Sequence, residues 1–315
     1  MKLLVLDRHP NLAGSLGSIQ SVAKDLGYHL LDDLSELPDI VLVIDWDESF
    51  SATISRAMRL GIQRVLVMHE PTVVIPKYHR ADFRSLFTKI LEVGRPSSNT
   101  VLHWPQNWNT DFFDNDERLE RMVAISSNKY SFVPGELYSL RAKAYSEIDA
   151  LDLFGRGWDR APGAVAAKLV KELLIASRDC NRSSWHCVRS SFLHPQNYIG
   201  HSPNKLATLS NYRYTLAIEN SLEFMSEKLV DGILAGSMPI YVGPPAESFG
   251  IPESLVFQAA PTLESIKLAH KRAAESDKDL WKRAAKSWIE DPSTRDKWEA
   301  KNCNARILES LNCQP

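Results

Sequence analysis

Residues 212–243 read YRYTLAIENSLEFMSEKLVDGILAGSMPIYVG, and their pattern indicates the class of fold. An apolar strand is expected over 214–219, a helix with one apolar face over 227–235, and a second apolar strand over 238–242. Continuous apolar strands separated by a helix are typical of a parallel sheet covered on both faces. Open sheets of this kind bind ligands at the carboxyl ends of their strands, so Glu219-Asn220-Ser221 marks a candidate site.

The same rhythm extends outward in both directions. Further strands are expected at 2–6, 39–45, 62–68, 121–126 and 150–154, and further helices at 16–26, 53–60 and 135–148. The polar stretch Asn107–Leu119 is the expected linker. A helix-rich tail over 262–311 carries three tryptophans, which we expect to pack it against the body. The prediction is an α/β chain with two Rossmann-like domains, 1–115 and 116–290, facing a cleft, followed by a helical tail, 291–315.

Composition excludes several classes of protein. A length of 315 residues exceeds what one core usually serves, which favours two domains. The net charge of −2, without any basic run, argues against nucleic-acid binding. The sequence contains no apolar stretch of the ~20 residues that a membrane span needs, so we expect a cytoplasmic protein. The cysteines (Cys180, Cys187, Cys303 and Cys313) fit neither a disulfide framework nor a zinc motif, and we expect reduced thiols. The sequence does not indicate an oligomeric state.

The residues that open the helix after Ser221 suggest anion binding. Ser226 is the expected N-cap, and free N–H groups at a helix start, together with Lys228, suit a diphosphate. Glu227 can accept hydrogen bonds from ribose hydroxyls, as acidic residues do in many nucleotide sites. The alternative is a solvated helix start at Glu227 and Lys228, with Glu219 and Asn220 closing a turn.

The whole block resembles the donor-binding signature of glycosyltransferase family 10, the α-1,3/1,4-fucosyltransferases of GT-B fold. That signature is an aromatic-rich strand ending in Glu-Asn-Ser, then Thr/Ser-Glu-Lys, a helix, and Gly-x-x-Pro-(apolar)₃-Gly. The corresponding residues here are Glu219-Asn220-Ser221, Ser226-Glu227-Lys228 and 236–243. Weaker likeness extends over 123–257, through segments at 125–128, 140–144, 151–155 and 204–206.

The resemblance implies an inverting glycosyltransferase of polysaccharide biosynthesis that transfers L-fucose from GDP-fucose to a hydroxyl of a glycan acceptor. It implies that Arg141 and Lys228 hold the diphosphate and Glu227 the ribose. Asn220 and Glu219 would contact the sugar or its neighbouring phosphate. Because the leaving diphosphate gains negative charge, these cations would replace a divalent metal, so neither a metal nor a tightly bound cofactor is expected. The rival for Arg141 is a solvated position on its helix.

An inverting transferase also needs a general base to take the proton of the attacking hydroxyl. Glu70 follows the strand expected at 62–68, and Pro71 keeps the turn after it extended. The family resemblance also implies a strand ending in Glu here, in the acceptor-side domain. Glu70 is therefore the candidate base and His69 the second choice, against the alternative of a surface Glu-Pro turn.

Asp45-Trp46-Asp47 is the pattern with which some transferases bind Mn²⁺ or Mg²⁺. The donor signature lies in the other domain, so we expect a turn or acceptor-contact role for Asp45 and Asp47, not a metal site.

Two other functions stay open, and a third is disfavoured. Phe224 stands where the family has a tyrosine whose hydroxyl contacts a phosphate, which keeps a GT-B transferase using another nucleotide sugar in consideration. A second rival is a non-catalytic module that binds a sugar nucleotide or a glycan. A two-domain oxidoreductase or epimerase is disfavoured, because residues 7–11 (DRHPN) after the first strand lack the G-x-G-x-x-G fingerprint.

Overall fold

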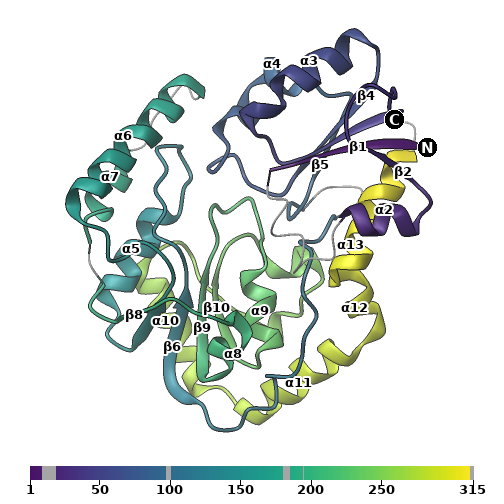
Figure 1. Ribbon diagram of the computed structural model, residues 1–315. Coiled ribbons are helices and arrows are strands. Elements are labelled where there is room, and N and C mark those ends of the chain that lie inside the picture. The colour runs from purple at the N-terminus through teal and green to yellow at the C-terminus, as the bar shows by residue number, and fades with distance from the viewer. Residues whose placement is uncertain (9–18, 97–100, 180–184, 194, 313–315) are drawn as a thin grey trace. The chain divides into compact units, whose positions relative to one another are not determined.

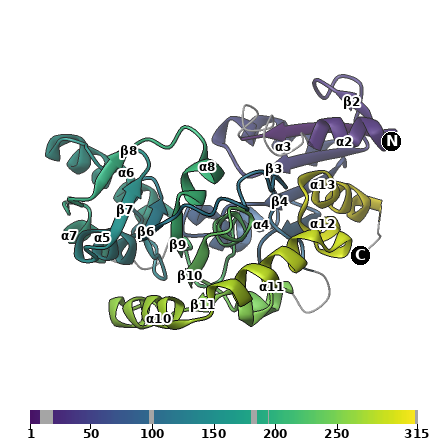
Figure 2. The same cartoon turned by 90° about the horizontal axis from the view of Figure 1, so that it is seen from below.

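The structure is a computed structural model that describes residues 1–8, 19–96, 101–179, 185–193 and 195–312. The chain divides into two compact units. Unit 1 comprises Met1–Trp108 with Pro292–Pro315, and unit 2 comprises Asn109–Asp291. Each unit holds one sheet flanked by helices (Figure 1, Figure 2), which confirms the predicted α/β fold class.

The sheet of unit 1 is parallel throughout and has the order β2-β1-β3-β4-β5. Its strands are β1 (Lys2–Asp7), β2 (His29–Leu31), β3 (Ile40–Ile44), β4 (Gln63–Met68) and β5 (Lys89–Glu92). Every residue of β3 is buried, as its continuous apolar sequence predicts. The strand order reverses between β1 and β3, and ligands of such sheets bind at the carboxyl ends beside that reversal.

Helices cover both faces of this sheet because successive side chains of a strand point to opposite faces. Val41 and Val43 pack toward α3 (Ser51–Arg59) and α4 (Ala81–Arg84). Ile40 and Leu42 face the opposite core, which holds α2 (Ile19–Asp25) and α13 (Ala300–Glu309). Figures 1 and 2 show α2 and α13 side by side, so the tail of the chain completes unit 1. The remaining elements are α12 (Pro292–Trp298) and 3₁₀ turns at 48–50, 76–79 and 310–312.

The helix expected at 16–26 is described from Ile19 to Asp25, and Leu16 lies outside the described residues.

The sheet of unit 2 is also parallel and has the order β11-β10-β9-β6-β7-β8. Its strands are β6 (Leu119–Ile125), β7 (Leu151–Phe154), β8 (Tyr198–Gly200), β9 (Tyr212–Ile218), β10 (Met238–Val242) and β11 (Phe257–Gln258). Counted from β6 to β11 along the chain, the spatial order is 3-2-1-4-5-6, that of doubly wound dinucleotide-binding sheets. The order reverses between β6 and β9, which places the ligand crevice where these two strands end.

The helices of unit 2 connect these strands. They are α5 (Tyr138–Glu147), α6 (Pro162–Asp179), α7 (His186–Ser190), α8 (Lys205–Ser210), α9 (Lys228–Leu234), α10 (Leu263–Glu275) and α11 (Lys278–Glu290), with 3₁₀ turns at 246–249 and 253–255. Trp281 is buried and donates its indole N–H to the Leu255 carbonyl. Trp288 and Trp298 are buried as well, which confirms that the tail tryptophans serve packing.

Candidate functional site

Arg141 lies at the point where the sheet order of unit 2 reverses. It projects from α5 and is only 3% exposed. Its Nε and Nη2 donate to the Ile218 carbonyl at the end of β9, at 2.9 and 2.6 Å. Nη2 also donates to Asn220 Oδ1 at 2.8 Å. The structure therefore brings Arg141 and Asn220 together, and the alternative of a solvated helix position for Arg141 is wrong.

Glu219 closes the loop between β9 and α9. Its side chain has no exposed surface, and its carboxylate accepts the Ser226 N–H at 2.9 Å and the Ser226 hydroxyl at 2.7 Å. Lys228 Nζ donates to Ser226 Oγ at 2.6 Å and lies 3.5 Å from Glu219 Oε2. Three residues that were expected to bind the donor nucleotide sugar thus form one network, and Glu219 is its fully buried member.

The expectation that Ser226 caps the following helix is wrong. α9 begins at Lys228, and the N-cap position belongs to Glu227, which has helical backbone angles and makes no side-chain capping bond. The physical reason is that the Ser226 hydroxyl is already occupied by Glu219 and Lys228.

Glu227 takes part in a second network, with Lys205 of α8. Lys205 Nζ lies 3.0 Å from Glu227 Oε1 and 2.7 Å from Asp231 Oδ2. Burial alone would raise the pKa of Glu227, but the charges of Lys205 and Lys228 outweigh it and lower that pKa. Burial would likewise lower the pKa of Lys205, and the carboxylates of Asp231 and Glu227 reverse this and raise it.

The pKa of Asp231 shifts in the opposite direction to that of Glu227. Burial, with the negative charge of Glu227 adding to it, raises the pKa of Asp231 despite the Lys205 ammonium. Sequence reasoning included Lys205 only within the segment 204–206 and assigned it no role. No local pattern could have identified it, because its partners lie 22 and 26 residues later in the chain.

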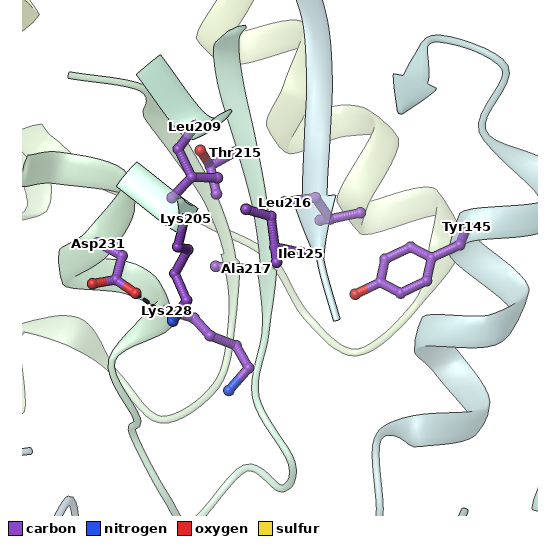
Figure 3. Close-up of a pocket in the computed structure, with 9 residues that line it drawn as sticks. All are labelled: Ile125, Tyr145, Lys205, Leu209, Thr215, Leu216, Ala217, Lys228 and Asp231. Atoms are coloured by element: carbon purple, nitrogen blue, oxygen red, sulfur yellow. Dashed lines mark hydrogen bonds and ion pairs between the residues drawn. The ribbon is translucent and has the colours of Figure 1, made fainter. Parts of the chain in front are cut away.

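A pocket opens between these networks and α5 (Figure 3). Ile125 at the end of β6 and Leu216 of β9 line it, and Tyr145 borders it from α5. Lys205 and Lys228 lie on the side opposite Tyr145, so two ammonium groups face one pocket. The pocket adjoins the ends of β6 and β9, where a doubly wound sheet binds its ligand.

Glu70, the candidate base, lies in unit 1, two residues after the end of β4. Its backbone N–H donates to Asp45 Oδ1 at 3.0 Å. The same oxygen accepts the His69 N–H and the Tyr78 hydroxyl, each at 3.0 Å. Asp45 is 3% exposed and has a left-handed φ of 51°. The buried carboxylate of Asp45, on a backbone in the left-handed region, therefore holds the turn that carries Glu70.

Burial sets the ionisation of this turn. It raises the pKa of Asp45 despite the hydrogen bonds from Glu70, Tyr78 and His69. It also lowers the pKa of His69 to about 4, against the opposing charge of Asp7. The His69 ring, packed edge-on against Trp104, is consequently neutral near pH 7.

Both aspartates of Asp45-Trp46-Asp47 have partners within turns. Asp47 Oδ1 accepts the Ser49 N–H at 3.0 Å and the Ser49 hydroxyl at 2.7 Å, which caps the 3₁₀ turn at 48–50. Together with the bonds of Asp45, this confirms the turn role expected for the pair.

The described residues contain no group of three or more His, Cys, Asp or Glu side chains that could hold a metal ion. Metal independence itself remains a prediction. Cys187 and Cys303 are buried free thiols, and burial raises their pKa values to about 12 and about 11. Cys180 and Cys313 lie outside the described residues. Within the same part of the chain, each helix is too short or too polar to cross a bilayer.

Comparison with known proteins gives one short sequence match and extensive structural likeness. No protein-family model matches the chain. A fucosyltransferase-like protein of Arabidopsis thaliana is 35% identical over 71 residues, which are 22% of this chain and 14% of that protein. An α1,3-fucosyltransferase structure aligns over 99% of this chain and 88% of its own, with 12% identity and a TM-score of 0.51. HepE of Anabaena, in complex with UDP and glucose, aligns over 99% of both chains, with 10% identity and a TM-score of 0.58.

At these identities the structural likeness shows the fold alone. The chain has a glycosyltransferase-type fold of the GT-B class, with two parallel α/β units, as the sequence predicted. The residues expected to bind the donor belong to unit 2 and the candidate base to unit 1.

Proposed function

We propose that the protein is an inverting glycosyltransferase that transfers L-fucose from GDP-fucose to a hydroxyl of a glycan acceptor. The observation that carries the proposal is the Lys228 ammonium group facing a pocket where β6 and β9 end. The Glu-Asn-Ser and Ser-Glu-Lys motifs of the family 10 resemblance surround the same point.

In this proposal Lys228 and Arg141 hold the donor diphosphate. Lys228 is 3.5 Å from Glu219, a loose ion pair that an incoming phosphate can replace. The two nitrogens of Arg141 that bind Ile218 and Asn220 fix its guanidinium plane, and Nη1 has no hydrogen-bond partner among the described residues. Fixed cations of this kind stabilise the charge that grows on a leaving diphosphate, so a divalent metal is not required.

Glu227 would accept hydrogen bonds from the ribose hydroxyls of the donor. Ionised carboxylates are strong acceptors, and the lowered pKa of Glu227 keeps it ionised at neutral pH. Asn220, whose Oδ1 is held by Arg141, would contact the sugar or its neighbouring phosphate.

Glu70 would act as the general base on the acceptor. Its carboxylate takes the proton of the acceptor hydroxyl while that oxygen forms a bond to the anomeric carbon. The bond from the anomeric carbon to the diphosphate breaks, GDP leaves, and attack from the opposite face inverts the configuration. The hydrogen bond from the Glu70 N–H to Asp45 supports a fixed position for this residue.

Calorimetric titration with GDP, UDP, CDP and ADP, each with and without Mn²⁺, tests the donor assignment. We expect GDP alone to bind tightly, with the same affinity in Mn²⁺. Lys228→Ala should weaken GDP binding about tenfold or more, because hydrogen bonds to charged groups contribute about 1.5–3 kcal/mol. Lys286→Ala, at a half-exposed lysine of the same unit, is the matched control and should bind like the wild type. Binding that prefers UDP or requires Mn²⁺ would contradict the proposal.

Glu70→Gln separates a transferase from a non-catalytic binding module. We expect this variant to lose transfer from GDP-fucose by at least about a hundredfold, the scale of general-base catalysis, while its GDP affinity is unchanged. Glu36→Gln, at an exposed position of unit 1, should keep full activity. Full activity of Glu70→Gln would remove Glu70 from the mechanism.

A GT-B transferase that uses another nucleotide sugar is the second candidate. Phe224 favours it, because this fully buried side chain offers no hydroxyl to a phosphate. Likeness to a protein in complex with UDP and glucose supports it too. The same titration decides between the two candidates.

A further inference from the structure

Lys205 lies between two acidic side chains of the α9 region. Glu227 and Asp231 are four residues apart, so they lie on one face of the helix, and Lys205 Nζ contacts both, at 3.0 and 2.7 Å. The three side chains are 39%, 28% and 11% exposed for Lys205, Glu227 and Asp231. They form a partly buried triad at the edge of the candidate donor pocket.

The triad needs its cation. Two carboxylates at this spacing repel each other, and loss of water makes each harder to ionise. Lys228 cannot replace Lys205, because its ammonium lies 3.8 Å from Glu227 and donates to Ser226 at 2.6 Å. Without Lys205, Glu227 would either take up a proton or turn toward water.

Both outcomes would remove the acceptor that a ribose needs. An ionised carboxylate only accepts hydrogen bonds, and it can serve two hydroxyls at once. Such bonds to a charged group are about twice as strong as neutral ones. A protonated or rotated Glu227 would offer fewer and weaker acceptors to the diol.

We propose that Lys205 is a positioning residue that holds Glu227 as an ionised acceptor for the donor ribose, and thereby makes the site selective for ribonucleotides. The inference rests on the proposed function, which gives Glu227 its ribose partner.

The test is the ratio of two dissociation constants, that of 2′,3′-dideoxy-GDP over that of GDP, measured by calorimetry on the intact protein. The wild type should favour GDP by about tenfold or more. We expect Lys205→Met to lower this ratio to about the value for Glu227→Gln. The double variant should show no further fall in the ratio, because the two residues act as one unit. Lys205→Arg should restore part of the selectivity, since it keeps the charge.

Lys278→Met is the matched control. Lys278 is 37% exposed and pairs with Glu120 at 2.9 Å in the same unit, so its loss removes a similar ion pair. Its ratio should equal that of the wild type. If Lys205→Met binds both nucleotides more weakly by the same factor, Lys205 only supports the fold and the inference is overturned.

The wild type tests the proposed function together with this inference, whereas the Lys205 variants test the inference alone. A wild type that binds no GDP contradicts both. A wild type that binds GDP and its dideoxy analogue equally well contradicts the ribose role of Glu227 alone. Lys205→Met leaves Asp231 without its cation and Glu227 with only the more distant Lys228, which is costly for folding. The variant Lys205→Met/Asp231→Asn removes one of these charges, and the same loss of selectivity is expected of it.

Discussion

One oxygen of Asp45 accepts three hydrogen bonds, from the N–H groups of His69 and Glu70 and from the Tyr78 hydroxyl. Asp45→Ala would leave these donors without a partner in a buried place. We expect it to lower the free energy of unfolding by about 3 kcal/mol or more, since each unsatisfied buried group costs about 1–3 kcal/mol. Urea denaturation measures this loss. Asp47→Ala, which removes an exposed cap, should cost about 1 kcal/mol, and equal losses for both variants would contradict the role given to Asp45.

His69 should make stability depend on pH. Burial lowers its folded pKa to about 4 from 6.5, so between these values the unfolded chain binds a proton that the folded chain does not. Stability from this residue is therefore fully present above pH 6.5 and is lost as pH falls toward 4. Asp45, whose pKa is raised in the folded state, contributes with the opposite sign. The stability that it gives the protein falls as pH rises above the unfolded pKa of 3.8.

The difference between wild type and His69→Gln isolates the histidine. In this variant the rise in unfolding free energy between pH 4 and 6.5 should shrink by about 1–3 kcal/mol. Urea denaturation at several pH values measures it. An unchanged pH profile would show that His69 is protonated normally in the folded state.

The part of the site that the sequence predicted best is the part made of neighbours in sequence. Glu219, Ser226 and Lys228 belong to one short block, and the structure joins them in one network. Lys205 was given no role, and Asp45 was expected in a turn but not as the residue that holds His69 and Glu70. The partners of Lys205 and Asp45 lie more than twenty residues away, and only the folded sheet brings them together. The role of a buried charged residue therefore depends more on partners that are distant in sequence than on the residues next to it in sequence.

Among the secondary-structure elements, the ends of β6 and β7 approach each other closely. Gly155, the residue after β7, makes this possible because it packs directly against the backbone of Ser126, the residue after β6. A Cβ there would lie 2.0 Å from the Ser126 carbonyl oxygen, and φ is +138°. Gly155→Ala should therefore displace Ser126 from the strand ends that border the pocket. We expect a loss of more than about 3 kcal/mol in unfolding free energy, from backbone strain and the clash together, and weaker GDP binding.

Gly163 provides the control for this substitution. It lies in α6, and among the described residues no atom outside its chain neighbours and its own helix backbone lies within 4 Å of the place that an alanine methyl group would take. Gly163→Ala should therefore stabilise the protein by about 0.5–1 kcal/mol. A thermal melt of both variants measures the contrast. A Gly155→Ala protein as stable as the wild type would show that the two strand ends can separate freely.

Strands were predictable where both faces are covered. β3 and β10 are buried at every residue, and each reads as an uninterrupted or nearly uninterrupted apolar run. The edge strands β2, β5, β8 and β11 were missed because they are short and only partly buried, so their sequences carry no such run. The Ser226 cap was wrong for a related reason: the Glu219 carboxylate competes for the hydroxyl from within the fold.

At the scale of the whole molecule, unit 1 depends on α13 and the turn that follows it. Ile307, Leu308 and Leu311 are buried in its core, and Gln106 exchanges backbone hydrogen bonds with Trp298 and Ala300. Burial of such side chains contributes about 1.5–3 kcal/mol each, which together approaches the 5–15 kcal/mol that holds a domain folded. A chain ending at Asp291 should therefore lose the cooperative unfolding of unit 1 and keep that of unit 2.

Differential scanning calorimetry distinguishes the two transitions. Lys301→Ala is the control, because among the described residues this lysine forms one surface ion pair, with Asp25 at 3.7 Å, which is worth at most about 1 kcal/mol. An unchanged unit 1 transition in the shortened chain would mean that α13 is dispensable.

The chain leaves unit 1 at Trp108 and returns at Pro292, and this has a consequence for synthesis on the ribosome. The first hundred residues emerge with one face of their sheet only partly covered, by α2, and α13, which completes that cover, follows only after all of unit 2. At about 5–20 residues per second the delay is on the order of ten seconds or more. Unit 2, which is continuous in sequence, can fold as it emerges, whereas unit 1 completes its core only once α13 has emerged. Until then the nascent chain exposes the part of an apolar sheet face that α13 covers, the kind of surface that chaperones bind.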